Sequence, residues 1–281
     1  MPGETIERSY TSYMNLNRII ASLRKVSVDQ SYTTVYSDAT SIFYAKPIKG
    51  IAFFHHANLF TNPNEYSFSQ KLALSMIIKR LERIDEIVTL SNFTKKTLQE
   101  HTKLGNIKAI PPYVNMPFPD AELVKKYRNI FKPPIILAVG TSIKIKNFVT
   151  LYKALSETDL TIVRVGGKKT SDAPSNIKFL GEGNLSSIEI SSIYAAADVL
   201  AFTSVDEGFG FPLIEAMSLG LPVVANRCTS IPEIVGDAGI LVKNPFDSLE
   251  LRESIFKALD HKTELSQKSY ELFIKDITMM G

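Results

Sequence analysis

One segment, residues 198–220, restricts the fold of this chain more than any other. It begins with a short apolar run, Asp198-Val-Leu-Ala-Phe-Thr203, which is typical of a buried strand in a parallel sheet. A turn containing Gly208 and Gly210 follows, and Pro212 suits the first turn of a helix, where no N–H is needed. The segment therefore predicts a strand, a glycine-bearing turn and a helix, which together form the repeating unit of α/β proteins.

The same turn carries a chemical signal. Free main-chain N–H groups and the positive end of a helix favour an anion such as a phosphate. Two carboxylates frame the turn: Glu207 lies on the loop, and Glu215 lies about one helical turn after Pro212. Carboxylates beside a phosphate are expected where the ligand also carries hydroxyl groups. The segment thus predicts a site for a phosphorylated ligand that contains a sugar or a ribose.

Around these two acids the sequence resembles a known family. The opening Glu-Gly-Phe-Gly at Glu207 and the continuation Glu-Ala-Met-Ser-Leu-Gly-Leu-Pro-Val-Val-Ala from Glu215 are similar to the signature of retaining nucleotide-sugar glycosyltransferases of family 4, also called glycosyl transferases group 1. Further segments match in the family order, at residues 85–95, 136–147, 176–181 and 231–242. The resemblance extends over residues 50–260 and is most specific at residues 204–226.

This resemblance implies an α/β protein with the GT-B fold, in which two Rossmann-like domains with mainly parallel sheets face a central cleft. The alternation of strand-like and helix-like segments agrees with that fold class. A proline cluster beginning at Pro111 breaks both helix and sheet, which indicates an interdomain connection. We expect an N-terminal acceptor-side domain with linker over residues 1–130 and a C-terminal donor domain over residues 131–260. A terminal helix over residues 261–281 often crosses back to the first domain in the family.

Hydrophobic periodicity places the individual elements. Strands are expected at residues 32–36, 51–54, 86–90, 107–110, 135–139, 160–165, 177–180, 199–202, 223–225 and 240–242. Helices are expected at residues 13–25, 67–83, 94–101 and, within the connection, 121–127. The last helix-prone stretch, residues 247–275, is expected to divide near His261.

A second segment, residues 140–147, follows an expected strand and leads into a helix, so that a lysine there can point at a diphosphate. The resemblance implies that Lys146 neutralises the donor diphosphate; a solvated surface charge is the alternative. Family members commonly carry an arginine directly after the strand glycine, where this chain has Thr141, and a replacement by Lys144 stays open. The implied donor-binding residues of this part of the chain are Gly140, Thr141, Ser142, Lys146 and Gly166, the last because glycine leaves room for the donor.

The resemblance also assigns roles to the two acids. It implies that Glu215 accepts hydrogen bonds from the donor ribose and that Glu207 holds hydroxyls of the transferred sugar. The main-chain N–H groups expected at the diphosphate are those of Gly208, Phe209, Gly210 and Phe211. The alternative for Glu215 is a carboxylate that only favours the helix dipole, worth about 0.3–1 kcal/mol.

In the first domain, His55 and His56 directly follow the strand-like run Gly50-Ile-Ala-Phe-Phe54. The carboxyl end of a strand faces the crevice where open α/β sheets bind ligands. Family members often place a histidine there, near the acceptor and the reacting carbon, so the resemblance implies a catalytic role for one of the pair. Adjacent side chains of a strand point to opposite sides, and the sequence leaves open which one faces the crevice.

Bulk properties exclude several classes of function. A net charge of +3 gives no indication of a nucleic-acid partner. No apolar run reaches the ~18–20 residues of a membrane span, and the N-terminus lacks a basic-then-apolar signal peptide, so we expect a cytoplasmic protein. Basic helices near residues 71–83 and 95–103 are typical of solvated faces; peripheral contact with the inner membrane face is the alternative.

The family's first strand and glycine-rich loop have no match near Met1, so we expect a shortened first domain or an absent upstream segment.

The sequence thus predicts a retaining glycosyltransferase that moves a hexose from a nucleotide-diphosphate sugar to a hydroxyl of a glycan, lipid or small-molecule acceptor. The chain contains no Asp-x-Asp, the paired carboxylates through which a divalent cation would hold the diphosphate. We therefore expect no metal requirement and no cofactor besides the donor substrate. Two alternatives stay open: a sugar phosphorylase on the same fold, and a non-catalytic nucleotide- or glycan-binding subunit.

Overall fold

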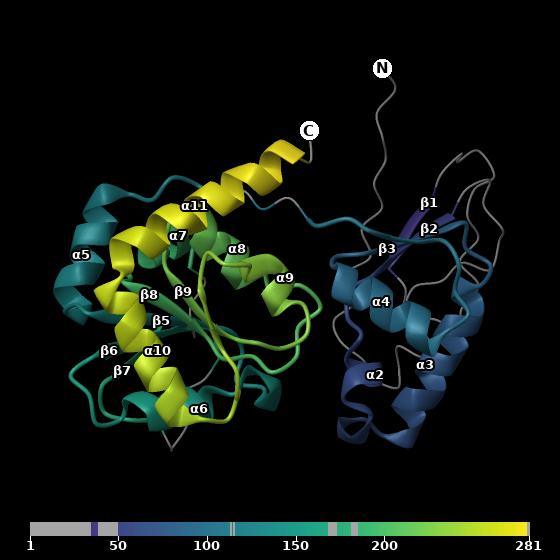
Figure 1. Cartoon of the computed structure of the whole chain (residues 1–281), viewed down its shortest axis with the longest axis horizontal. Coiled ribbons are helices and arrows are strands. Elements are labelled where there is room, and N and C mark those ends of the chain that lie inside the picture. Colours follow the sequence, from purple (N-terminus) through teal and green to yellow (C-terminus); the bar gives the residue numbers. More distant parts are fainter. Residues whose placement is uncertain are drawn as a thin grey trace. The chain divides into compact units, whose positions relative to one another are not determined.

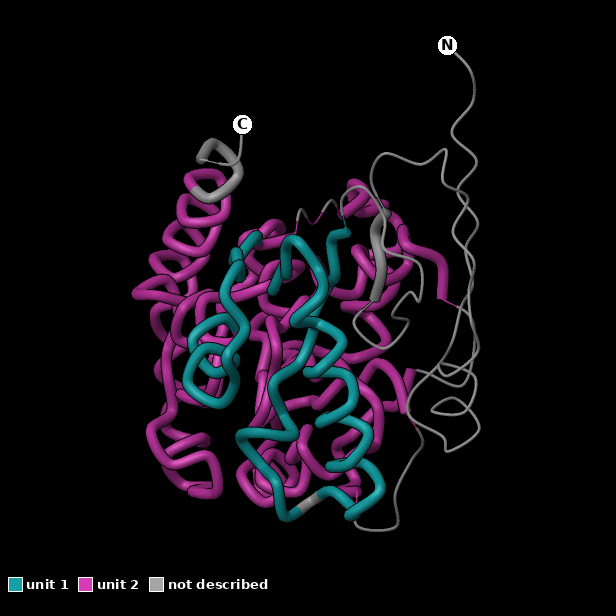
Figure 2. Tube along the Cα trace, turned by 90° about the vertical axis from the view of Figure 1, so that its right-hand side faces the viewer, with its two compact units in different colours: residues 1–89, 95–110 teal, residues 90–94, 111–281 magenta. Residues whose placement is uncertain are grey.

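The computed structural model describes residues 35–38, 50–112, 114, 116–167, 173–180 and 185–279. The helix expected at residues 13–25 lies outside these residues. The chain divides into two compact units (Figure 2): Met1–Thr89 with Lys95–Ile110, and Leu90–Thr94 with Pro111–Gly281. The main division falls where the proline cluster begins, so the connection expected at the end of the first domain is part of the second unit.

The first unit is built on a parallel sheet whose four strands follow one another in chain order. Its strands are β1 (Val35–Asp38), β2 (Gly50–Phe54), β3 (Glu86–Thr89) and β4 (Ile107–Ala109). The helices of this part of the chain are α2 (Asn58–Thr61), α3 (Phe68–Leu81) and α4 (Asn92–His101), with a 3-10 turn, η1 (Pro63–Glu65). Apolar side chains of the strands and of α3 and α4 form one core, in which Ala52 and Leu98 are fully buried.

The second unit contains a parallel sheet of six strands in the order β10-β9-β8-β5-β6-β7. These strands are β5 (Ile135–Val139), β6 (Thr161–Val165), β7 (Ile177–Leu180), β8 (Val199–Phe202), β9 (Val223–Asn226) and β10 (Ile240–Val242). The first strand of this sheet in chain order, β5, therefore pairs with both the second, β6, and the fourth, β8. This is the Rossmann strand order, which reverses direction between β5 and β8.

Helices cover both faces of this sheet (Figure 1). One face packs against α6 (Phe148–Leu155) and α10 (Ser248–Asp260), and the other against α5 (Ala121–Phe131), α7 (Ser187–Ala196), α8 (Phe211–Ser218) and α9 (Ile231–Val235). Alternate residues of β5 serve the two cores: Ile135 and Leu137 face α5 and α7, whereas Ile136 and Ala138 face α6 and α10. The last helix, α11 (Lys262–Met279), follows His261, where the division was expected, and packs against α8.

A buried carboxylate fixes the start of β8. Asp198 is only 5% exposed and accepts the N–H of Ile135, the first residue of β5, at 2.7 Å. Arg128 of α5 approaches the same carboxylate at 3.3 Å, and the ammonium of Lys262, the first residue of α11, also donates to it. A single side chain therefore joins the central strands to two helices that lie far apart in the sequence.

Candidate functional site

The candidate site lies at the carboxyl ends of β5 and β8, where the strand order reverses. The loop after β5 leads through a 3-10 helix, η2 (Lys144–Lys146), to α6, and the loop after β8 leads to α8 on the opposite face. Two hydrogen bonds join these loops: the N–H of Val205 donates to the carbonyl of Ile145, and the hydroxyl of Thr203 donates to the carbonyl of Lys146, both at 2.8 Å. Ligands of open α/β sheets bind in the crevice at such a point.

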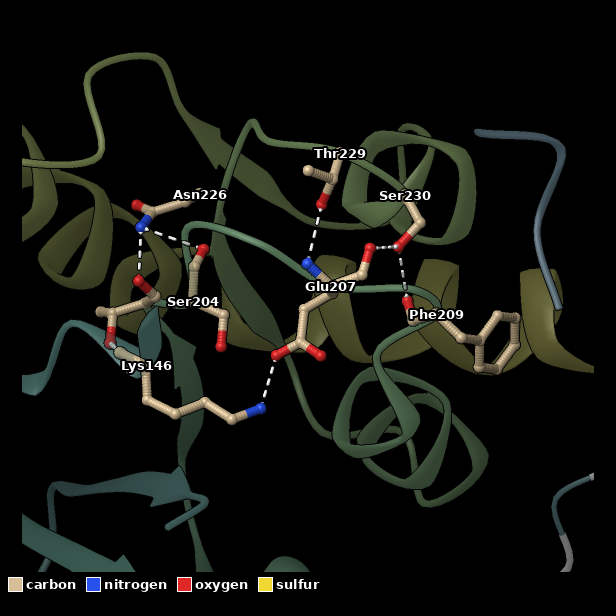
Figure 3. A network of polar contacts seen from close by, with 8 residues as sticks. Lys146, Ser204, Glu207, Phe209, Asn226, Thr229 and Ser230 are labelled. Atoms are coloured by element: carbon tan, nitrogen blue, oxygen red, sulfur yellow. Dashed lines mark hydrogen bonds and ion pairs between the residues drawn. The ribbon is translucent and has the colours of Figure 1, made fainter. Parts of the chain in front are cut away.

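Lys146 and Glu207, which the sequence analysis assigned to one donor site, come together here (Figure 3). The ammonium of Lys146 lies 2.6 Å from Oε1 of Glu207, and the two side chains are only 16% and 11% exposed. Such a charge-assisted bond is stronger than an exposed ion pair because little water screens it. The stem of Lys146 passes over Gly140, where a Cβ would lie 3.4 Å from its Cδ and Cε. A Cβ at this distance would be in ordinary van der Waals contact, so the φ of 145°, and not a lack of space, favours glycine here.

The loop that carries Glu207 is held from the side of β9. The hydroxyl of Thr229 accepts the N–H of Glu207 at 3.1 Å, and the hydroxyl of Ser230 lies 3.0 Å from the carbonyls of both Glu207 and Phe209 (Figure 3). The amide of Asn226, the last residue of β9, donates to the carbonyl of Thr203 at 2.7 Å. These contacts leave the Glu207 carboxylate directed at Lys146 rather than at its own loop.

The sequence pattern did not indicate the residues that hold this loop. Asn226 could have been found, because it is a polar residue that ends an apolar strand at the ligand-binding edge of the sheet. Thr229 and Ser230 gave no comparable signal, since their contacts join segments that are distant in the sequence.

The turn after Glu207 presents unpaired main-chain donors. Within the described residues, no acceptor contacts the N–H groups of Gly208, Phe209, Gly210 and Phe211. Gly210 has a φ of 104°, and a Cβ there would lie 2.9 Å from Cδ1 of Leu213, so glycine is required before α8. Phe209 is buried, whereas Phe211 is 44% exposed although the two rings meet edge to face at 5.4 Å. The start of α8 can therefore donate to an anion.

Glu215 lies on α8, and a tyrosine holds its carboxylate. The hydroxyl of Tyr194, which is fully buried in α7, donates to Oε2 of Glu215 at 2.5 Å. Burial raises the pKa of Glu215, and the hydrogen bond from Tyr194 opposes that rise. Burial and the neighbouring carboxylate raise the pKa of Tyr194 well above its ordinary value, so the phenol stays a neutral donor. Tyr194 was missed because it stands inside the apolar run Ile193-Tyr-Ala-Ala.

The remaining donor-site residues predicted for this unit lie on the loops after β5 and β6. A Cβ on Gly166 would lie 3.1 Å from the carbonyl oxygen of Gly140, so glycine permits the close approach of these two loops. Thr141 and Ser142 are exposed on the first loop, as is Lys144. These residues thus share one edge of the sheet with Lys146.

His55 and His56 belong to the first unit, where they directly follow β2. The ring of His55 is half-buried and stacks on Phe53 at a centroid distance of 6.4 Å, whereas His56 is exposed. Their position at the carboxyl end of a parallel strand agrees with the expectation from the sequence. A catalytic role for one of them stays a prediction.

The described part of the chain contains neither a metal-binding cluster nor a membrane-spanning helix. Among the described residues, no three His, Cys, Asp or Glu side chains gather closely enough to hold a metal ion. None of the helices described combines the length and the apolar composition that crossing a bilayer requires.

Part of the chain is similar to a known protein family. Residues 133–261 match the family model for glycosyl transferases group 1. The O-antigen chain mannosyltransferase B of Escherichia coli is 49% identical over 67 residues, which are 24% of this chain and 17% of the relative. The O-antigen chain mannosyltransferase RfbU of Salmonella typhimurium is 28% identical over 205 residues, which are 67% of this chain and 55% of the relative. The chain thus spans about half the length of these curated relatives, or less.

Solved structures share the fold of the chain. Sucrose-phosphate synthase from Thermosynechococcus elongatus aligns with a TM-score of 0.74 and 21% identity, covering 87% of this chain and 69% of that one. The HepE protein of Anabaena, solved in complex with UDP and glucose, aligns with a TM-score of 0.73 and 19% identity, covering 87% and 73%. At this level of identity the likeness concerns the fold alone, and the prediction of a GT-B α/β fold with mainly parallel sheets is confirmed. Residues 133–261 of this chain are therefore similar to the glycosyl transferases group 1 family, in a chain with the GT-B fold.

Proposed function

We propose that this protein is a metal-independent, retaining glycosyltransferase that takes a hexose from a nucleoside-diphosphate sugar. The observation that carries the proposal is the Lys146–Glu207 pair, 2.6 Å apart and nearly buried, at the point where the strand order of the second unit reverses. Beside it, the turn before α8 presents main-chain N–H groups without acceptors in the described part of the chain. A cation, amide donors and two carboxylates are the groups that a diphosphate joined to a sugar and a ribose would need.

The reaction asks these groups mainly to stabilise charge. When the bond between the anomeric carbon and the diphosphate oxygen breaks, negative charge develops on the leaving diphosphate, and Lys146 and the amides of residues 208–211 offset it. Glu207 binds sugar hydroxyls, and Glu215, held by Tyr194, binds the ribose. The acceptor hydroxyl attacks from the face that the diphosphate leaves, so the anomeric configuration is retained without an enzyme nucleophile. The proton of that hydroxyl passes to the departing diphosphate.

The sugar and nucleotide are proposed from the relatives. Two of them are named as O-antigen chain mannosyltransferases, which favours a mannosyl group. A structural neighbour was solved with UDP and glucose, which supports a nucleoside diphosphate as the bound part of the donor. The acceptor hydroxyl belongs to a glycan, a lipid or a small molecule, with His55 or His56 on the acceptor side.

The proposal is tested by binding and transfer together. Thermal unfolding is measured with UDP, GDP, ADP, CDP and dTDP and with the corresponding hexose donors, since a ligand of the native state raises the melting temperature. We expect the nucleoside diphosphate of one base, and its hexose donor, to raise the melting temperature. The protein should release the nucleotide from that donor with or without an acceptor. The anomeric configuration of the product is then read by NMR. A phosphorylase would instead cleave a disaccharide with phosphate, and a binding subunit would bind the donor without releasing nucleotide.

Substitutions at the ion pair test the site. Lys146→Ala and Glu207→Ala should each lower turnover by at least about tenfold, equivalent to about 1.4 kcal/mol of barrier. The reason is that each removes a group proposed to touch the donor. Lys257→Ala, on the exposed side of α10, removes a charge near the amino edge of the sheet and serves as the control. Near-normal transfer by both site variants would contradict the assignment.

A further inference from the structure

A fully buried arginine lies next to the proposed donor site and takes no part in the function described so far. Arg164, the penultimate residue of β6, is 1% exposed. Its guanidinium donates to the hydroxyl of Tyr152 at 2.6 Å and to that of Ser142 at 2.9 Å, and it lies 3.9 Å from the ring centre of Phe148. All three neighbours are uncharged, so the positive charge is embedded among neutral groups.

The charge of Arg164 has no counter-ion in the described part of the chain. No carboxylate described there lies within ion-pair distance of the guanidinium, and its Nε–H is buried without an acceptor. Burying an unpaired cation is unfavourable, and a neutral side chain at the same place would leave the fold more stable. Contact with Phe148 and two hydroxyl groups reduces this penalty but adds no negative charge. An anion outside the described residues, such as a bound ligand, is therefore the partner that would balance Arg164.

The position of Arg164 leads to the same ligand as the site beside it. Ser142, to which it donates, is exposed on the loop that also carries Lys146. A Cβ on Gly167 would lie 2.8 Å from Nη2 of Arg164 and 2.5 Å from Oγ of Ser142, so a larger residue could not stand beside them. The guanidinium thus lies directly beneath a loop at the carboxyl edge of the sheet, where ligands bind.

The ion pair gives the reason for a second cation. Glu207 already offsets the charge of Lys146, so the pair as a whole is neutral. A diphosphate brings more than one negative charge, which this neutral pair cannot balance. Between partly buried groups, electrostatic attraction acts over several ångströms with little screening.

We infer that Arg164 is the second cation of the donor site: a positioning residue that fixes Ser142 and supplies the positive charge that balances the bound diphosphate. The inference rests on the proposed function. Arg164 need not contact the donor. Its positive charge attracts the diphosphate from beneath the loop, and its hydrogen bond to the hydroxyl of Ser142 holds that loop in place. Since the attraction depends on phosphate charge, it should affect diphosphates most and nucleosides least.

The first test compares ligands of graded charge. Calorimetric affinities are measured for UDP, GDP, ADP, CDP and dTDP, and for the monophosphate and nucleoside of whichever base binds. Arg164→Met should weaken the diphosphate by at least about tenfold and the nucleoside by less than about twofold, because the lost positive charge attracts the phosphates and not the uncharged nucleoside. Lys257→Met removes the same charge from exposed α10 and should leave all affinities unchanged.

The outcomes separate the two proposals. If the wild-type protein binds none of the diphosphates, the proposed function fails and this inference fails with it. Two other outcomes would refute only the role of Arg164, provided that the wild type binds one of the diphosphates. In the first, Arg164→Met binds that diphosphate as tightly as the wild type does. In the second, Arg164→Met loses affinity for the nucleoside and for the diphosphate by the same factor.

A second pair of variants avoids any change in the core. Ser142→Asp places a carboxylate beside the guanidinium on an exposed loop, and Ser142→Asn is its uncharged match in size. If Arg164 lacks a counter-ion, the Asp variant should melt at a higher temperature than the Asn variant without ligand, and it should bind the diphosphate at least about tenfold more weakly. Equal melting temperatures would show that the charge of Arg164 is already balanced, and would overturn the inference even if Arg164→Met does not fold.

Discussion

At the scale of one residue, Glu215 combines a proposed ligand-binding role with a cost to the fold. Its carboxylate is largely withdrawn from water on α8, and only the hydroxyl of Tyr194 is seen to compensate it. Burial raises the pKa of Glu215, which means that its ionised form is less favourable in the folded protein than in the unfolded chain. A carboxylate kept under such conditions is typical of a binding group rather than of a stabilising one.

The first prediction follows from the direction of that shift. Because the folded pKa is raised, the penalty of ionised Glu215 is absent below its unfolded pKa and grows as the pH rises through the folded pKa. Glu215→Gln removes the charge, so it should melt at a higher temperature than the wild type at pH 8 and at the same temperature near pH 4. The measurement is thermal unfolding across this pH range, together with nucleoside-diphosphate affinity, which should fall.

Glu253→Gln is the matched control, because Glu253 is an exposed carboxylate on α10. It should follow the wild type at every pH. If Glu215→Gln is less stable than the wild type at pH 8, the ionised carboxylate stabilises the fold. The argument from stability for Glu215 as a ligand-binding group would then fail.

At the scale of elements, the second unit depends on one carboxylate to join parts that are distant in the sequence. Asp198 directly precedes β8 and contacts β5, α5 and α11 through the N–H of Ile135 and the cations Arg128 and Lys262. Burial alone would raise the pKa of Asp198, but the hydrogen bonds from Lys262 and from the Ile135 N–H, with the charges of Lys262 and Arg128, lower it overall. Its ionised form therefore stabilises the fold.

The second prediction concerns this junction. Asp198→Asn should lower the free energy of unfolding by about 2–4 kcal/mol at pH 7, because it leaves buried or half-buried donors poorly matched. Because the pKa of Asp198 is lower in the folded protein than in the unfolded chain, its ionised form contributes stability above the unfolded pKa. This stabilising contribution is lost as the pH falls through the folded pKa. Denaturant unfolding should therefore show the two proteins converging below about pH 4, the ordinary range of an aspartate.

Asp260→Asn provides the comparison, since Asp260 is an exposed carboxylate at the end of α10. Its unfolding free energy should match that of the wild type at pH 7. A difference between Asp198→Asn and wild type that stays constant from pH 7 to pH 3 would contradict the proposed ionic origin.

The elements themselves were largely predictable, and the exceptions have physical reasons. The bounds of β5, β7, β8 and β10 agree with the apolar runs that predicted them, and β5 and β8, in the middle of the sheet, are buried along almost their whole length. The helix expected to stop at Tyr127 instead continues to Phe131, since both rings are buried and stack at 5.7 Å. The segment was interpreted as a short helix within a linker because the preceding prolines indicated an interdomain connection.

The candidate site was predictable to a smaller extent. Lys146 and Glu207 were found from local motifs, and the structure brings them within 2.6 Å. Arg164 and Tyr194 were missed because each interrupts an apolar run by one residue, and only the folded chain shows what they contact. Local sequence patterns identify residues on loops; they do not reveal buried polar residues whose partners lie on other elements.

At the scale of the whole molecule, all predicted donor-binding residues belong to the second unit, and the two histidines belong to the first. The third prediction uses this division. Hydrogen exchange is compared with and without the nucleoside diphosphate that binds. Exchange should slow by severalfold at residues 140–147 and 204–211, because amides that contact the ligand become protected, while β2 and β3 stay unchanged.

An inert nucleoside without phosphate, measured at the same concentration, is the reference for non-specific effects. Slower exchange confined to residues 50–89 would place the nucleotide in the first unit. That result would reverse the assignment of donor and acceptor sides.

The bond between Lys146 and Glu207 also determines how the protein responds to abundant cellular salts. A site whose ammonium already has an internal carboxylate offers little attraction to free phosphate or sulfate, which would have to displace that carboxylate. A molecule that brings hydroxyls for Glu207 and oxyanions for Lys146 replaces both halves of the ion pair that it breaks. The pair would thus weaken the binding of simple ions and favour the intact donor over its fragments.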